Sequence, residues 1–165
     1  MRAFFVIAAA LFLTACGFRP LYEAGGSSAA MRTHLSGIEV APIADRLGQV
    51  MRNNLLDRLN AGATPNYRLS VVLEQSTQGF GIRPDAAATQ EELTLLATVT
   101  FVKLDGEEVI FTEQMRARTA YDLVLSDFST VTQREDSARR LALELAERIH
   151  RRLALYFTRQ EAEGR

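Results

Sequence analysis

The chain has 165 residues, a formal net charge of −1 at pH 7 and a hydrophobic content of 47%. The near-neutral charge argues against a general nucleic-acid binder, which would carry a clear basic excess. His34 and His150 lie far apart in sequence and Cys16 is the only cysteine, so the sequence predicts no metal site, no cofactor and no disulfide within the chain.

The first segment, residues 1–15, has the pattern of a secretory signal peptide. Arg2 supplies one positive charge, and an apolar run without a polar residue follows from Ala3 to Leu13. This run is well short of the ~20 apolar residues that a membrane-spanning helix needs. The run closes with Leu-Thr-Ala-Cys, which resembles the lipobox of bacterial lipoproteins. We therefore expect cleavage before Cys16, acylation of Cys16, and anchoring of the mature chain to a membrane.

Residues 16–37 are predicted to be an acylated N-terminus and a flexible tether. The stretch from Gly25 to Ala30 contains only small residues, which suits a linker that holds a domain away from a membrane. Gly17 after the cysteine, by resemblance to enteric lipoproteins, favours the outer membrane. A single domain is expected over residues 38–160, followed by a frayed tail at residues 161–165.

The domain is predicted to begin with a strand and a helix. Residues 38–43 alternate until Pro42 ends the strand. A helix capped by Asp45 follows, and Gly62 is the residue expected to end it in a left-handed turn. The apolar residues of this helix recur every three or four positions and should pack on a sheet: Leu47, Val50, Met51, Leu55 and Leu59.

Three further strands are predicted, over residues 67–77, 93–104 and 109–121. A loop is expected over residues 78–90, and Asp105-Gly106 predicts a tight type I′ hairpin turn. Alternation places one apolar set on a buried face: Leu93, Leu95, Ala97, Val99, Phe101, Val109, Phe111, Met115 and Ala117. The opposite face is rich in Thr, Gln and Arg.

The last predicted element is a long helix over residues 133–160. Thr132 and Glu135 fit a capping box at its start. A continuous apolar stripe predicts the buried face: Ala138, Leu141, Ala142, Leu145, Ile149, Leu153 and Tyr156. The whole pattern predicts an α+β two-layer sandwich, a four-stranded mixed sheet with two helices packed on one face.

Catalytic motifs are missing from the sequence. It contains no nucleophile elbow, no phosphate-binding loop and no paired histidines. The acidic pairs Glu91-Glu92, Glu107-Glu108 and Glu135-Asp136 fall at the ends of predicted elements, where charges are usually solvated. The sequence therefore predicts a binding protein and not an enzyme.

Two stretches carry a resemblance to a known family. The first is Cys-Gly-Phe-Arg-Pro-Leu-Tyr over residues 16–22, and the second is the C-terminal run from Ala120 to Phe157. Together with the order of the elements, they resemble the lipopolysaccharide (LPS) assembly lipoprotein family LptE. The resemblance implies a lipid-anchored protein on the periplasmic face of the outer membrane. It also implies a non-catalytic plug and assembly partner of an LptD-like β-barrel, which binds LPS and helps to insert it into the outer leaflet.

Four basic residues away from the predicted helix layer are candidates for contact with LPS phosphates: Arg83, Lys103, Arg116 and Arg118. Alternatively, they are ordinary solvated charges or contacts to a barrel wall. A different function also remains open, that of a periplasmic auxiliary lipoprotein of an ABC-type lipid transporter.

Overall fold

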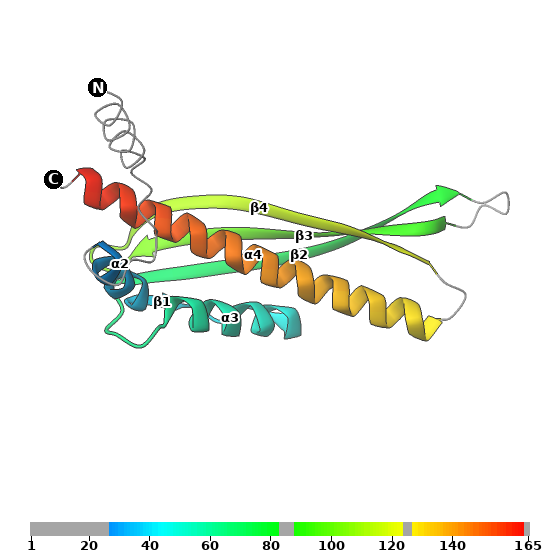
Figure 1. Cartoon of the computed structure of the whole chain (residues 1–165), viewed down its shortest axis with the longest axis horizontal. Helices are drawn as coiled ribbons and strands as arrows, with labels where there is room; N and C mark the ends of the chain where they lie inside the picture. Colours follow the sequence, from blue (N-terminus) through cyan, green and yellow to red (C-terminus); the bar gives the residue numbers. More distant parts are fainter. Residues whose placement is uncertain (1–26, 83–87, 124–126, 164–165) are drawn as a thin grey trace, which may run out of the picture. The chain divides into compact units, whose positions relative to one another are not determined.

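Four strands form one sheet in the order β1-β2-β3-β4: β1 (Ile38–Val40), β2 (Tyr67–Ile82), β3 (Ala88–Lys103) and β4 (Glu108–Asp122). β1 runs parallel to β2, and the other neighbours are antiparallel. Three helices accompany the sheet: α2 (Ser27–Ser36), α3 (Asp45–Leu59) and α4 (Asp127–Glu163) (Figure 1). α3 and α4 pack on each other and on one face of the sheet. The predicted α+β sandwich with two helices on one face is confirmed.

This computed structural model describes residues 27–82, 88–123 and 127–163. Residues Met31–Arg165 form one unit, and the account below concerns that unit. The predicted signal peptide and Cys16 lie outside the described residues, as does Arg83.

The core lies between the helices and the sheet. Five odd-numbered side chains of β3 are at most 1% exposed, as the alternation predicted: Leu93, Leu95, Ala97, Val99 and Phe101. The facing stripe of α4 is equally buried around Leu145, Ile149 and Leu153. Phe101 is the centre of an aromatic cluster, with ring centroids 5.2–6.2 Å from those of Tyr67, Phe111, Tyr156 and Phe157. Such pairs stabilise a core beyond their buried area.

Part of the segment predicted to be a flexible tether is helical, namely α2. Residues 16–37 were predicted to be flexible, but Ser27–Ser36 form this helix. Met31 and Leu35 are 9% and 6% exposed and belong to the core. The run of small residues concealed the helix, because the two large apolar side chains that hold it come after that run. The domain thus begins before Ile38.

The ends of α3 differ from their predictions. Asp45 has φ 66° and is the first helical residue, while Ala44 precedes the helix without a side-chain cap. The C-terminal turn uses Asn60, with φ 51° and ψ 42°, and not Gly62. Asparagine tolerates this left-handed conformation better than most residues, so the helix ends two positions earlier than the glycine indicated.

The hairpin between β3 and β4 is wider than predicted. Residues 104–107 form the turn, and the positive φ values fall on Gly106 (87°) and Glu107 (54°), not on Asp105. A register shift follows, since Phe101 pairs with Phe111 while Val102 pairs with Val109. This bulge turns Val109 to the other face of the sheet, where it is 58% exposed. The predicted burial of Val109 is therefore wrong.

The strands β2 and β3 and the helix α4 are longer than predicted. The loop predicted over residues 78–90 is mostly strand, because β2 extends to Ile82 and β3 begins at Ala88. α4 begins at Asp127, so the predicted capping box at Thr132 is wrong. The Thr132 hydroxyl lies inside the helix and donates to the carbonyl of Phe128 at 3.0 Å. Both extensions consist largely of polar residues. Backbone hydrogen bonds, and not burial of apolar side chains, stabilise them, so no hydrophobic pattern predicted them.

Gly48 provides a test of packing between α3 and the preceding segment. A Cβ at this position would lie 2.9 Å from the carbonyl carbon and oxygen of Ile43 and 2.6 Å from its Cγ2. We expect Gly48→Ala to lower the free energy of unfolding by roughly 1–2 kcal/mol, after a partial offset from helix propensity. Urea denaturation measures this. Gly62→Ala is the control, because its Cβ would meet no atom within 4 Å; equal stability of the two variants would contradict the packing argument.

Candidate functional site

The sheet face opposite the helices is polar and carries no described helix. Because side chains alternate between the two faces along a strand, the even-numbered residues of β2 and β3 lie on it. Residues paired across β2, β3 and β4 form rows on this face. The rows read Ser70-Thr100-Thr112, Val72-Thr98-Gln114, Glu74-Leu96-Arg116 and Ser76-Thr94-Arg118. The amide of Gln114 donates to the hydroxyl of Thr98 at 3.4 Å. We call these four rows the open face.

Arg116 and Arg118 lie side by side on the open face, as the period predicted. A guanidinium nitrogen of Arg118 lies 4.0 Å from a carboxylate oxygen of Glu92, and the two side chains are 68% and 36% exposed. Such an exposed pair contributes little stability and leaves both groups available to a ligand. The Arg116 side chain is exposed as well. The open face therefore presents two neighbouring cations.

Lys103 does not join them. It is the last residue of β3 and pairs with Tyr67 and Glu108. Because it is odd-numbered, it belongs to the face of the sheet that the helices cover. It lies seven positions along β3 from Leu96, the partner of Arg116, which corresponds to about 24 Å along the strand. The four sequence candidates are thus not one cluster in the described chain: two are together, one is apart, and Arg83 is outside the described residues.

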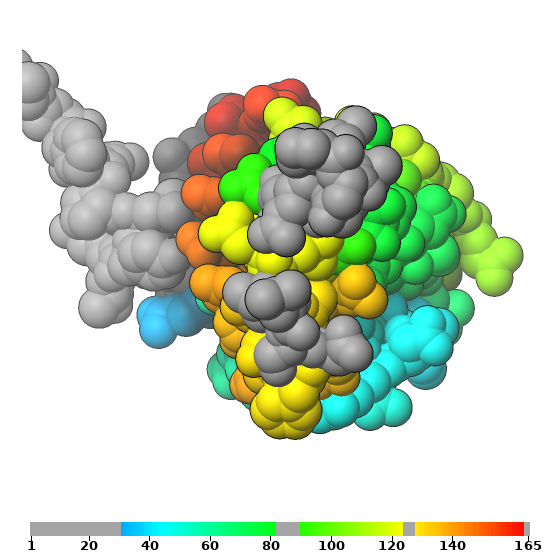
Figure 2. Space-filling view, turned by 90° about the vertical axis from the view of Figure 1, so that its right-hand side faces the viewer, coloured from blue at the N-terminus to red at the C-terminus, as the bar shows by residue number. Residues whose placement is uncertain are grey.

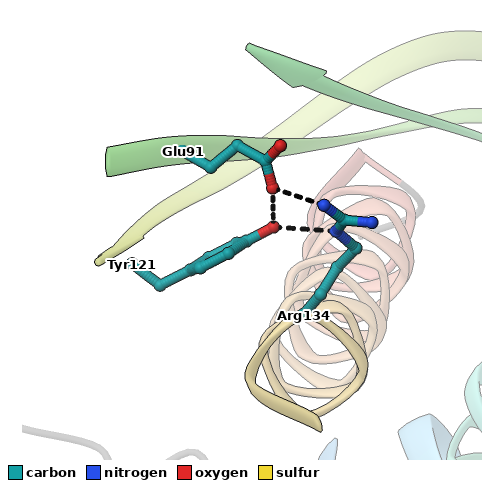
Figure 3. Close-up of polar contacts among 3 residues, drawn as sticks. All are labelled: Glu91, Tyr121 and Arg134. Carbon is teal, nitrogen blue, oxygen red and sulfur yellow. Dashed lines mark hydrogen bonds and ion pairs between the residues drawn. The ribbon is translucent and has the colours of Figure 1, made fainter. Parts of the chain in front are cut away.

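A polar cluster joins the sheet to α4 far from the aromatic core. Glu91 and Tyr121 are paired across β3 and β4, and Arg134 reaches them from α4 (Figure 3). The Tyr121 hydroxyl donates to a carboxylate oxygen of Glu91. Arg134 donates through Nε to the Tyr121 oxygen at 2.9 Å and through a terminal nitrogen to the same Glu91 oxygen at 2.8 Å. Every member contacts the other two.

The cluster favours the charged carboxylate. Hydrogen bonds from Tyr121, then from Arg134, lower the pKa of Glu91 below its ordinary 4.5. Burial, together with the hydrogen bond to Glu91, raises the pKa of Tyr121 above 10. The hydrogen bonds to Tyr121 and Glu91 also raise the pKa of the Arg134 guanidinium. All three groups therefore keep their neutral-pH protonation states, which suits a structural clasp and not proton transfer.

Sequence reasoning treated Glu91 as a solvated charge at a strand end. The register of the β3–β4 hairpin could have placed it opposite Tyr121, but the bulge shifts that register by one residue. The contribution of Arg134 depends on how α4 packs, which no local pattern reports.

Two more arginines fasten α4 to β4. Arg148 donates to the backbone carbonyl of Arg116 at 2.7 Å. Arg152 donates to Glu113 at 2.8 Å, and its guanidinium carbon lies 4.3 Å from the ring centroid of Phe111. These contacts tie β4 to α4 at Glu113 and at the backbone of Arg116, so the strand that carries the cations of the open face is held by the helix.

A groove of about 430 Å³ lies on the helix side, between the start of α3 and the first half of α4. Leu47 and Val50 line one wall, Ala138 and Arg139 the other, and Gln75 of β2 lies between them. In the end-on view of Figure 2, the cyan start of α3 lies beside the yellow and orange residues of α4.

Within the described residues, no three metal-ligating side chains come together. No described helix combines the length and the apolar character that would let it span a bilayer.

Comparison with known proteins gives a family. The model of the family described as LptE, lipopolysaccharide assembly, matches residues 34–153. An uncharacterized protein of Rickettsia prowazekii is 24% identical over 160 residues, which cover 97% of this chain and all of that protein.

Solved structures share the fold. A crystal structure from Caulobacter crescentus, described as a candidate lipoprotein, has a TM-score of 0.63 and 21% identity; the match covers 79% of this chain and 97% of that one. Rare lipoprotein B of Shewanella oneidensis has a TM-score of 0.61 and 16% identity, over 75% of this chain and 98% of that one.

The clasp predicts an acid-sensitive contribution to stability. The pKa of Glu91 is lower in the folded chain than in the unfolded chain, so its contribution is complete above the unfolded value near 4.5. It is lost as pH falls through the folded pKa. We expect Glu91→Gln to be less stable than wild type at pH 7 and to show a flatter loss of stability between about pH 5 and pH 3. Thermal unfolding across pH measures this. Glu74→Gln, on the open face, should keep the wild-type slope; identical slopes for all three proteins would refute the clasp.

Proposed function

We propose that this chain, which belongs to the LptE family of lipopolysaccharide-assembly lipoproteins, is the plug and assembly partner of an LptD-like outer-membrane β-barrel. The observation that carries the proposal is the family match over residues 34–153, which spans nearly the whole folded unit. The family is non-catalytic, so the chain is not an enzyme, in agreement with the absence of catalytic motifs from the sequence.

The open face supports a role inside a barrel. The interior of a large membrane barrel is polar, and a plug needs a surface that hydrogen-bonds to it. Ser, Thr and Gln side chains fill the rows around Thr100 and Thr98, and Val72 adds an apolar patch that is 59% exposed. Hydroxyl and amide groups of this kind can both donate and accept hydrogen bonds, so they fit a polar wall without burying a charge.

The proposed location of the protein is the periplasmic face of the outer membrane. Cys16, acylated after removal of residues 1–15, would hold the chain there, because more than one acyl chain makes insertion effectively stable. The lipobox-like Leu-Thr-Ala-Cys sequence and the lipoprotein relatives support this part of the proposal.

Direct binding of LPS is proposed for Arg116 and Arg118. Their guanidinium groups are exposed, adjacent and carried on a strand that α4 fastens from below. Guanidinium groups bind phosphate oxygens in a bidentate manner, and two in a row match a phosphorylated lipid headgroup. Lys103 lies too far away to share that ligand.

The role is tested by purification from detergent-solubilised membranes of the native host. We expect the full chain to co-purify with a large β-barrel protein of the outer membrane. Intact mass of the same sample should show loss of residues 1–15 and acyl chains on Cys16. Replacement of Val72 by Asp should reduce the yield of the barrel, because it puts a charge in place of the exposed apolar side chain in the uncharged rows of the open face.

Leu155→Asp is the matched control, because Leu155 is 53% exposed on α4 and not on the open face. Co-purification with inner-membrane ATPase components instead of a barrel would favour the alternative role in an ABC-type lipid transporter and reject the plug.

The ligand site is tested with purified LPS. Charge reversal by Arg116→Glu with Arg118→Glu should weaken binding about tenfold or more, since each lost charge-assisted contact contributes roughly 1–3 kcal/mol. Surface-immobilised LPS measures affinity, and circular dichroism checks folding. The pair Arg151→Glu with Arg159→Glu, which are exposed on α4, reverses the same charge elsewhere. If both double variants bind equally, Arg116 and Arg118 are not the site.

A further inference from the structure

β2 is far longer than its outer neighbour. β1 pairs only with Tyr67, Arg68 and Leu69, while β2 continues to Ile82. The amide of Ala41 donates to the carbonyl of Leu69, and no later outward-pointing group of β2 has a described partner strand. Among the described residues, the outer half of β2 is therefore a free sheet edge.

The register identifies which backbone groups are free. In an antiparallel pair the residues of one strand alternate between bonding to that partner and pointing away from it. Leu69 points outward, to β1, so Gln75, Thr77 and Gly79 point outward as well. The same alternation makes the even residues of β4 point outward, which the bond from Arg148 to the carbonyl of Arg116 verifies. Three consecutive outward residues of β2 thus offer both a donor and an acceptor.

This edge lacks the usual protection. Exposed edges are normally defended by charges, proline or a covering side chain. The stretch Gln75-Ser76-Thr77-Gln78-Gly79-Phe80 contains neither a charge nor a proline, and all six residues are exposed. The edge of β4, by contrast, carries Glu113, Arg116 and Arg118 and is covered in part by Arg148. The sheet thus has a protected edge at β4 and, on its opposite side, an edge of β2 that can accept another strand.

The groove between α3 and α4 adjoins that edge. Gln75 belongs to both, because its backbone points outward while its side chain lines the groove. Of the charged groups that line it, Arg134 is held by Glu91 and Asp136 by Arg140 at 3.3 Å. Arg46 and Arg139, one from each wall, have no described ion pair. Among the groove's charged groups without a described ion pair, these two cations outnumber the one carboxylate, that of Glu135. The groove therefore favours an anionic side chain.

We propose that an extended acidic segment of a partner protein adds to the free edge of β2 at Gln75–Gly79 and places a carboxylate in the groove between Arg46 and Arg139. The free backbone groups supply affinity, and the groove selects the side chain, as in other cases of strand addition. The alternate side chains of that segment fall on the opposite face, along Ser76 and Gln78 and toward Phe80, which is 40% exposed and suits an apolar residue. This binding site is separate from Arg116 and Arg118 and does not depend on LPS.

The probe is a seven-residue peptide of alternating Glu and Val, blocked at both ends and fluorescently labelled, added to the whole protein. We expect saturable binding by fluorescence anisotropy. Saturation should slow amide hydrogen exchange at Gln75, Thr77 and Gly79. Exchange at Ser76 and Gln78 should hardly change, because their amides already bond to β3. A Lys-Val peptide of the same length should bind about tenfold more weakly or not at all.

Two variants separate the edge from the groove. Thr77→Pro removes an outward donor without removing a bond to β3, and should weaken the probe about tenfold. Gln114→Pro makes the same change on the β4 edge and should leave affinity within about twofold. Arg46→Glu with Arg139→Glu should reverse the preference between the two peptides, which an unfolded protein would not do. Arg151→Glu with Arg159→Glu should not reverse it.

Three outcomes would overturn the proposal. The first is the absence of saturable binding by the Glu-Val peptide. The second is equal binding by wild type and Thr77→Pro, which would leave a groove for anions without strand addition. The third is competition by dodecyl phosphate with no protection of the three outward amides, which would assign the groove to a lipid.

Discussion

Burial of the odd-numbered side chains of β3 beneath α4 is the interaction on which the rest of this structure depends. The 37 residues of α4 span about 55 Å, and the 16 residues of β3 span about 53 Å, so one helix covers one strand from end to end. Period two then commits every even-numbered residue of β3 to the other face. A deep core on one side and a long polar surface on the other are two consequences of the same match in length.

The two ends of that contact are held differently. Around Phe101 the helix is fixed by aromatic packing, and around Glu91 by a clasp of charged and hydroxyl groups. This change of chemistry explains what sequence reasoning could reach. Periodicity predicted the β3 face and the α4 stripe because apolar burial leaves a repeating pattern. Periodicity did not predict the outer half of β2, the start of α4 or the role of Arg134, because polar contacts leave no repeating pattern in the sequence. The helix end at Asn60 and the bulge at Ile110 are decided by backbone conformation, and a prediction from residue spacing misplaces them by one or two positions.

The same division applies to function. Family membership and the proposed anchor at Cys16 could be argued from short stretches of sequence. The proposed ligand residues could be predicted only in part: Arg116 and Arg118 share a face because the alternation of a strand is local, whereas the separation of Lys103 follows from where β3 ends. The free edge of β2 was invisible to the sequence, since it arises from the shortness of β1.

α2 has one more consequence. With Met31 in the core and Ser27–Ser36 helical, an acyl anchor at Cys16, as proposed above, would be joined to α2 by eleven residue steps, which reach at most about 40 Å when fully extended. A tether of that length would keep the domain close to the membrane that holds the anchor. A partner in the same membrane would then be met at a high effective concentration.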